Sequence, residues 1–120
     1  MEIVTAQATA KSTIEVPLMD FEKAFLMRKQ QGYALMLDIR LASGESMACP
    51  YAHLLDIRLR KGELILHFAA EVVTVLGRNL KEVYDVLREQ RVEAIQEQGE
   101  RYDGGEESEA YITKITVEDL

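Results

Sequence analysis

The sequence has one cysteine, two prolines and no tryptophan among its 120 residues. A single cysteine cannot form a disulfide within the chain, which favours a reducing, cytoplasmic setting. No apolar run approaches the roughly 18 residues that a membrane-spanning helix requires. Residues 1–16 also lack the basic start and apolar block of a secretory signal. The sequence therefore predicts a cytoplasmic globular protein.

Basic residues are in deficit only in the second half of the chain. Residues 1–60 contain seven Lys or Arg and seven Asp or Glu, whereas residues 61–120 contain seven basic and fourteen acidic residues. The whole net charge of −7 therefore belongs to the second half. Nucleic-acid backbones and anionic membrane surfaces both attract clustered Lys and Arg. The charge distribution predicts neither nucleic acid nor membrane as a partner.

The length of 120 residues predicts a single domain over residues 1–120. Residues 1–12 carry no apolar periodicity, and we expect them to be disordered. Residues 99–109 are rich in Glu and Gly and predict an acidic loop.

Two segments have the signals of helices. Asp20 is placed to cap a short helix over residues 20–31, which Gly32 would end. Asn79 and Glu82 form a capping-box pattern at the start of a long amphipathic helix, which would run to Gly99.

Alternating apolar and polar residues predict strands in the remainder. They cover residues 33–41, 45–49, 55–60, 63–76 and 111–117, with turn signals at 43–44 and 61–62; residues 63–76 would form one bent strand or two short strands. Such short turns connect antiparallel neighbours. We therefore expect an α+β fold: an antiparallel meander of about five to six strands, a short N-terminal helix, and one long helix packed on the sheet.

A nine-residue pattern occurs twice. Residues 37–45 read LDIRLASGE and residues 55–63 read LDIRLRKGE. One Gly per copy does not make a phosphate-binding loop. Asp38 with Arg40, and Asp56 with Arg58, would project away from each Leu-Ile-Leu face. Two interpretations remain: a solvated face with weak ion pairs, or a face that docks a partner.

The segment MACPYAH, residues 47–53, contains the only cysteine and one of two histidines. Cys49, Tyr51, His53 and His67 could line one pocket if the sheet brought them together. A structural zinc site needs four ligands, and a nucleophilic cysteine needs a base and a third orienting group. Neither pattern is complete, and a lone buried cysteine is usually a small apolar residue. We therefore predict no catalytic residue, no metal and no cofactor.

Arg91 would break the pattern of the long helix, because it falls about 20° from Leu80 on the helical wheel. A buried guanidinium must be paired, or must extend its charged end to water. We expect Arg91 to reach solvent near the helix end, or to pair with an acidic group of a strand or of a second subunit.

The segment VTVLGRN, residues 73–79, combines an apolar strand with Gly, Arg and Asn. Together with a preceding helix and bent sheet, residues 20–80 look similar to the Sm-like RNA-binding fold. That resemblance implies RNA binding. The long helix expected after residue 79 departs from the Sm-like pattern, and the acidic charge opposes RNA.

Three functions stand as hypotheses. The first is a non-enzymatic interaction module that forms a homodimer or binds another protein, with Asp38, Arg40, Asp56, Arg58 and Arg91 as interface candidates. The second is a ligand-binding or enzymatic domain that uses Cys49, His53 and His67. The third is an Sm-like RNA-binding module.

Overall fold

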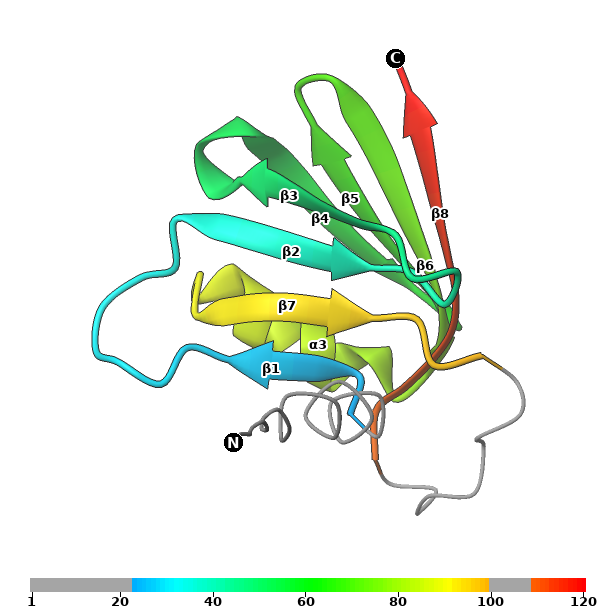
Figure 1. Ribbon diagram of the computed structural model, residues 1–120. Helices are drawn as coiled ribbons and strands as arrows, with labels where there is room; N and C mark the ends of the chain where they lie inside the picture. The colour runs from blue at the N-terminus through cyan, green and yellow to red at the C-terminus, as the bar shows by residue number, and fades with distance from the viewer. Residues whose placement is uncertain (1–22, 100–108) are drawn as a thin grey trace, which may run out of the picture.

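A computed structural model describes residues 23–99 and 109–120, which form two four-stranded sheets and one α-helix (Figure 1). The elements in chain order are β1 (Phe25–Met27), β2 (Met36–Arg40), β3 (Ser46–Pro50), the 3-10 turn η1 (Tyr51–His53), β4 (Leu54–Arg60), β5 (Glu63–Phe68), β6 (Glu71–Arg78), α3 (Leu80–Arg88), β7 (Val92–Gln96) and β8 (Tyr111–Asp119).

The first sheet has the strand order β1-β7-β2-β3, and we name it sheet 1. Strand β7 lies in its middle, antiparallel to β1 and parallel to β2. The β2–β3 hairpin completes the sheet, with Leu37 opposite Cys49. Strands that are neighbours in sheet 1 are therefore distant in the sequence, except within that hairpin.

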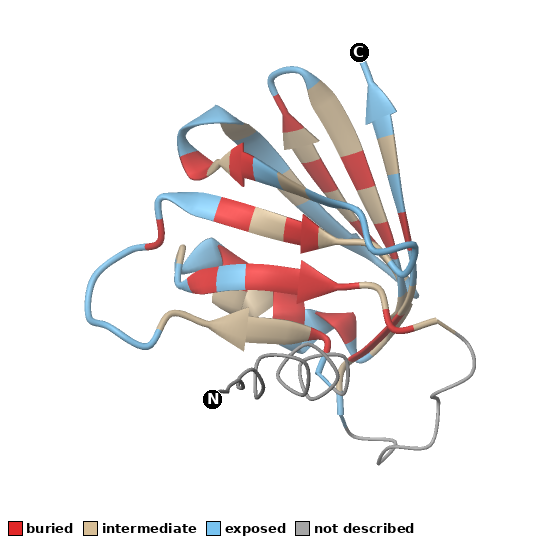
Figure 2. Ribbon diagram, viewed as in Figure 1, coloured by how far each residue is buried: buried red, intermediate tan, exposed pale blue. Residues whose placement is uncertain are grey.

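The second sheet has the order β4-β5-β6-β8, and we name it sheet 2. All of its strands are antiparallel. Strand β4 forms one edge and β8 the other. Period-two burial along β5 and β6 points alternate side chains to the core, as the bands of colour in Figure 2 show.

The core fills the space between the two sheets and α3. Its fully buried members come from both sheets and from the helix: Leu37, Ile39, Leu64, Leu66, Phe68, Val73, Val75, Val83, Val92, Ile95 and Ile112. Helix α3 contributes Leu80, Val83 and Leu87, which lie on one face at helical spacing. Burial of this apolar surface is the main stabilising term of the fold.

Residues 97 and 98 join the two sheets. Glu97 accepts hydrogen bonds from the backbone N–H groups of Ala42 (2.8 Å) and Ile115 (3.2 Å). The buried Gln98 accepts one from the N–H of Ile112 at 2.9 Å. The Glu97 and Gln98 side chains thus accept hydrogen bonds from backbone N–H groups on the outer edge of β8, which would otherwise be unpaired in the interior.

The predicted α+β class with mostly antiparallel pairing is confirmed, but its details are not. The described residues contain eight strands rather than five or six, arranged in two sheets, and one strand pair is parallel. Both nine-residue copies begin hairpins, since β2 leads into β3 and β4 into β5.

The long helix predicted over 79–99 is wrong. Helix α3 ends at Arg88, and Gln90 then takes a left-handed φ of 60°. Glycine usually occupies that position, so the sequence does not mark the end. Residues 92–96 form β7, although Glu, Ala and Gln favour helices, because pairing on both sides overrides local propensity.

The short helix predicted over 20–31 is also not observed in the residues described. Phe25–Met27 form β1, which pairs with β7. Residues 20–22 lie outside the described part of the chain, as do residues 1–12 and 100–108, on which the expected disorder and most of the acidic loop fall. Within residues 23–99 and 109–120, no helix is long and apolar enough to cross a membrane.

Candidate functional site: a groove under the edge strand β4

The core-facing side chains of strand β4 are less buried than those of the neighbouring strand β5. Along β5, Leu64, Leu66 and Phe68 are fully buried. The core-facing residues of β4 are not: Ile57 is half-buried and Leu59 remains 36% exposed. The outer edge of β4 pairs with no strand in the described residues. Both the backbone edge and the inner apolar face of β4 are therefore accessible.

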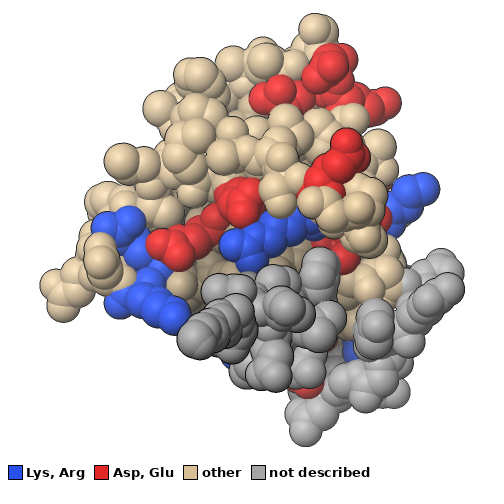
Figure 3. Space-filling view, in the orientation of Figure 1, with Lys and Arg blue, Asp and Glu red and all other residues tan. Residues whose placement is uncertain are grey.

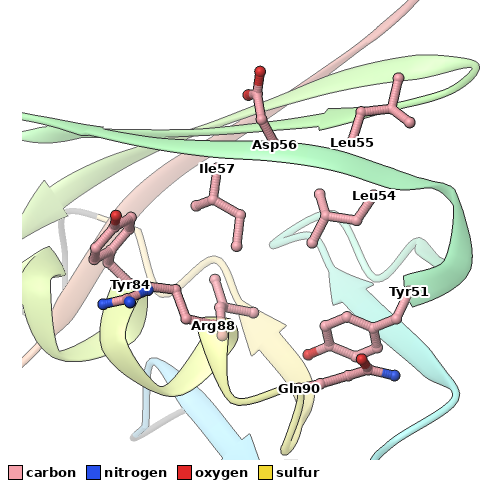
Figure 4. A pocket seen from close by; sticks show the side chains of 9 residues that line it. Tyr51, Leu54, Leu55, Asp56, Ile57, Tyr84, Arg88 and Gln90 are labelled. Carbon is pink, nitrogen blue, oxygen red and sulfur yellow. The ribbon is translucent and has the colours of Figure 1, made fainter.

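A bulge at Leu55 changes the face that each residue of β4 presents. Leu54 is opposite Phe68, but Asp56 is opposite His67, so one residue of β4 is left over. Leu55 and Asp56 consequently both point away from the core, while Leu54 and Ile57 point toward it (Figure 4). The sequence predicts Leu55 on the core face, and the structure corrects this: its side chain is 70% exposed.

A groove lies between the inner face of β4 and the end of α3, with a volume of about 390 Å³. Figure 4 shows side chains that surround it, contributed by η1, β4, α3 and the segment after the helix. They are Tyr51, Leu54, Leu55, Asp56, Ile57, Tyr84, Leu87, Arg88 and Gln90. Leu54, Ile57 and Leu87 supply apolar walls between the two tyrosine rings.

Two polar side chains of the groove, those of Tyr51 and Gln90, donate hydrogen bonds to the backbone of the fold. The Tyr51 hydroxyl donates to the carbonyl of Val92 at 2.7 Å, and burial raises the pKa of this phenol far above its ordinary range. Tyr51 is thus a neutral wall rather than an acid or base. The Arg88 guanidinium lies 5.5 Å from the centre of the Tyr84 ring. The Gln90 amide donates to the carbonyl of Ala34 at 3.1 Å.

Exposed apolar side chains lie on the segment before β2, next to η1. The backbone N–H of Tyr51 donates to the carbonyl of Leu35 (3.0 Å), which places residues 33–36 beside η1. Leu35 is 78% exposed, and Tyr33 and Met36 are also exposed. Exposed apolar groups gathered in one place are typical of binding surfaces.

The structure separates the residues predicted to share a pocket. Cys49 is buried in the core, with its Sγ 3.9 Å from the Glu71 carboxylate, and burial followed by the Glu71 charge raises the pKa of the thiol. His67 alternates with buried residues of β5 and so lies on the outer face, where its Nδ1 is 2.9 Å from Asp56. His53 is exposed in η1.

Tyr51 is the only one of these four that lines the groove. In the described part of the chain, no three His, Cys, Asp or Glu side chains are grouped so as to hold a metal ion.

The predicted interface residues lie in three places. Asp38 and Arg40 pair at 2.8 Å on the outer face of β2, where Arg40 also donates to Gln96 at 3.2 Å. Asp56 and Arg58 lie on β4, 3.7 Å apart. Figure 3 shows acidic and basic side chains interspersed across the face that carries sheet 1.

Arg91 is exposed in the connection between α3 and β7, where its carbonyl accepts a hydrogen bond from the N–H of Arg28 at 2.7 Å. It is not part of a helical stripe, because the helix ends three residues earlier.

Sequence reasoning missed the groove itself. Tyr84, Arg88 and Gln90 were not candidates, because their proximity to β4 depends on how the helix packs. One local signal was present: the adjacent Leu54 and Leu55 break strict alternation, which is the pattern of a bulge. Comparisons of the chain with protein-family models, with curated proteins and with solved structures found no match.

Proposed function

We propose that this chain is a non-enzymatic protein-interaction module that binds an extended segment of a polypeptide along the open edge of β4. One observation carries the proposal: among the described residues, a strand edge without a partner and a groove with Leu, Ile and Tyr in its walls occur at the same place. A segment that adds to a sheet edge gains backbone hydrogen bonds, and its alternate side chains enter the pocket beneath.

The chemistry of the groove supports a peptide more than a small polar substrate. Leu, Ile and Tyr side chains share its walls with Asp56, Arg88 and Gln90. The Tyr51 and Gln90 polar groups bond to the backbone. Asp56 points away from the groove, and Arg88 lies against the Tyr84 ring (Figure 4). Small-molecule sites usually have several polar groups that converge on the ligand. The alternative that uses Cys49, His53 and His67 gains no support, because these side chains lie in the core, on η1 and on the outer face.

The regular part of β4 after the bulge sets the length of the segment. Asp56–Arg60 pair with β5 without interruption. Edge strands that must remain unpaired commonly carry a bulge or a charge that discourages association. Here the bulge occupies only the beginning of the strand, so about five residues remain open for pairing.

A peptide probe tests this proposal. The probe is a capped seven-residue peptide, Lys-Thr-Ile-Thr-Val-Thr-Lys, titrated into ¹⁵N-labelled protein while amide resonances are followed by NMR. We expect shifts confined to β4, η1 and the C-terminal turn of α3. The control peptide has the same sequence with N-methyl groups on alternate residues, which removes the edge hydrogen bonds. Equal shifts with both peptides, or shifts elsewhere, would overturn the proposal.

A further inference from the structure

We infer that the segment bound at this edge is β4 of a second copy of the chain, paired antiparallel about a two-fold axis at Ile57. The inference rests on the proposed function and names its partner. Symmetric homodimers are the commonest oligomers, and their interface is the same surface on both subunits. The sequence of β4 must then be complementary to itself, and this can be checked residue by residue.

Directly opposed residues of an antiparallel pair point to the same face of the sheet. A self-pairing must therefore be centred on a residue, because any register centred between two residues would oppose apolar and charged faces. Within the regular part of the strand, the candidate centres are Asp56, Ile57, Arg58, Leu59 and Arg60.

Only the centre at Ile57 avoids a like-charge contact. Centring on Asp56, Arg58 or Arg60 brings that charged residue against itself at the axis, and centring on Leu59 opposes Arg58 and Arg60. Centring on Ile57 opposes Asp56 of each copy to Arg58 of the other, which gives two opposite-charge pairs. Opposed like charges destabilise a strand pair, and opposite charges stabilise it.

The charged groups of this face are available for exchange. The side chains of Asp56 and Arg58 are 46% and 58% exposed, and their separation of 3.7 Å is loose for an ion pair. On the adjacent strand, the His67 imidazole is the other group that faces Asp56, at 2.9 Å. Arg58 of the second copy can thus reach the free side of the carboxylate without breaking a buried contact.

The apolar face of β4 is complementary in the same register. The two Ile57 side chains meet at the axis above the grooves. Leu59 of the second copy falls opposite the bulge, where Leu54 rather than Leu55 points inward (Figure 4). Leu59 is 36% exposed and Leu54 and Ile57 are half-buried in the single chain. Pairing would cover the inner face of β4, which the core of one copy leaves uncovered.

Charge-swap variants test this register by sedimentation velocity between about 1 and 500 µM protein. We expect the wild type to shift from 13.6 kDa to twice that mass as concentration rises. Asp56→Arg and Arg58→Asp each convert both cross-strand pairs to like charges, so each should weaken association at least tenfold. The double variant should restore it, and an equimolar mixture of the two single variants should form a heterodimer.

Asp85→Arg is the matched control. It makes the same change of charge at a side chain of similar exposure, 42%, on α3, and it should leave association unchanged. Association that the single swaps do not weaken, or that the double variant does not restore, would overturn the inference.

A wild type that stays monomeric throughout the range would overturn the inference as well. The probe peptide is then decisive for the proposed function. It is titrated into the wild-type chain, whose β4 edge is then not occupied by a second copy. If the peptide binds, the second copy is refuted as the partner but the peptide-binding edge is supported. If it does not bind, both proposals are refuted.

Discussion

At Gly77 the backbone of β8 leaves no room for a side chain, and replacing this glycine by alanine should strongly destabilise the fold. A Cβ at this position would lie 1.9 Å from the carbonyl oxygen of Tyr111, 2.9 Å from its carbon and 3.1 Å from the Cα of Ile112. All three atoms belong to the backbone of β8, so no side-chain rotation relieves the contact. Strands β6 and β8 would have to separate by more than an ångström at the register shift between Leu76 and Gly77.

The magnitude follows from what that separation disrupts. Overpacking a rigid site costs about 1–3 kcal/mol. Two pairs of the β6–β8 ladder, Gly77 with Ile112 and Arg78 with Tyr111, lie at the contact, and each lost backbone hydrogen bond costs about 1 kcal/mol. We expect Gly77→Ala to lower the free energy of unfolding by about 3–5 kcal/mol, a large part of the roughly 5–15 kcal/mol of a typical domain.

Urea unfolding followed by far-UV circular dichroism measures this loss. The control is Gly44→Ala in the β2–β3 turn, where φ is +98° and no atom lies within 4 Å of the added Cβ. Gly44→Ala introduces only left-handed backbone strain, about 1–2 kcal/mol. If Gly77→Ala is no more destabilising than Gly44→Ala, the conflict between a Cβ at residue 77 and the backbone of β8 is refuted.

Three further substitutions or measurements address other parts of the fold. Glu97→Gln leaves one acceptor oxygen where the carboxylate accepts from two backbone N–H groups, one of them on the buried Ile115. We expect the free energy of unfolding in urea to fall by about 1–2 kcal/mol. An unchanged unfolding midpoint would contradict the bridging role of Glu97. Tyr51→Phe removes the 2.7 Å hydrogen bond to the Val92 carbonyl and should lower the free energy of unfolding by about 1 kcal/mol in the same assay. Tyr51→Ala also removes the ring that forms a wall of the groove, so its loss should be larger. Equal losses for the two variants would show that the ring adds nothing beyond its hydrogen bond. Burial raises the pKa of the Cys49 thiol above its ordinary 9.0, so the thiol should resist Ellman's reagent at pH 8 until urea unfolds the chain. Because the unfolded thiol ionises at lower pH than the folded one, this residue's contribution to stability is complete below pH 9 and is lost as the pH rises beyond it; rapid modification of the folded protein would refute the buried placement.

The strands that could be predicted are those whose signals are local. Alternation and the turns at residues 43–44 and 61–62 locate β2 to β6, and the final strand β8 follows in the same way. Strands β1 and β7 could not be predicted, because their residues favour helices and become strands only by pairing with each other and with β2. The early end of α3 depends on a left-handed Gln90, which no residue type announces.

The site was predictable to the same limited extent. Asp56 and Arg58 followed from the repeated motif, and Tyr51 from its place in the segment MACPYAH, which links two strands. The groove that brings Tyr51 and Asp56 near Tyr84 and Arg88 depends on the packing of α3 against β4, which is a property of the folded chain. The bulge also makes the two copies of LDIRL differ: Leu37 is fully buried, whereas the corresponding Leu55 is mostly exposed.

The position of β7 in sheet 1 has a consequence for synthesis on the ribosome. β1 and β2 emerge early, but they are not neighbours in sheet 1. The strand that lies between them, β7, is formed by residues 92–96 and is synthesised later. The hairpins of β4, β5 and β6 need only local contacts and can form first, since local contacts form faster than distant ones. Sheet 1 is therefore completed only when β7 has emerged and inserts between β1 and β2, and sheet 2 is completed later still, when β8 pairs with β6. A nascent chain halted before Val92 would leave one edge each of β1, β2 and β6 without its partner strand, and a separate polypeptide that carries β7 and β8 would supply all three pairings.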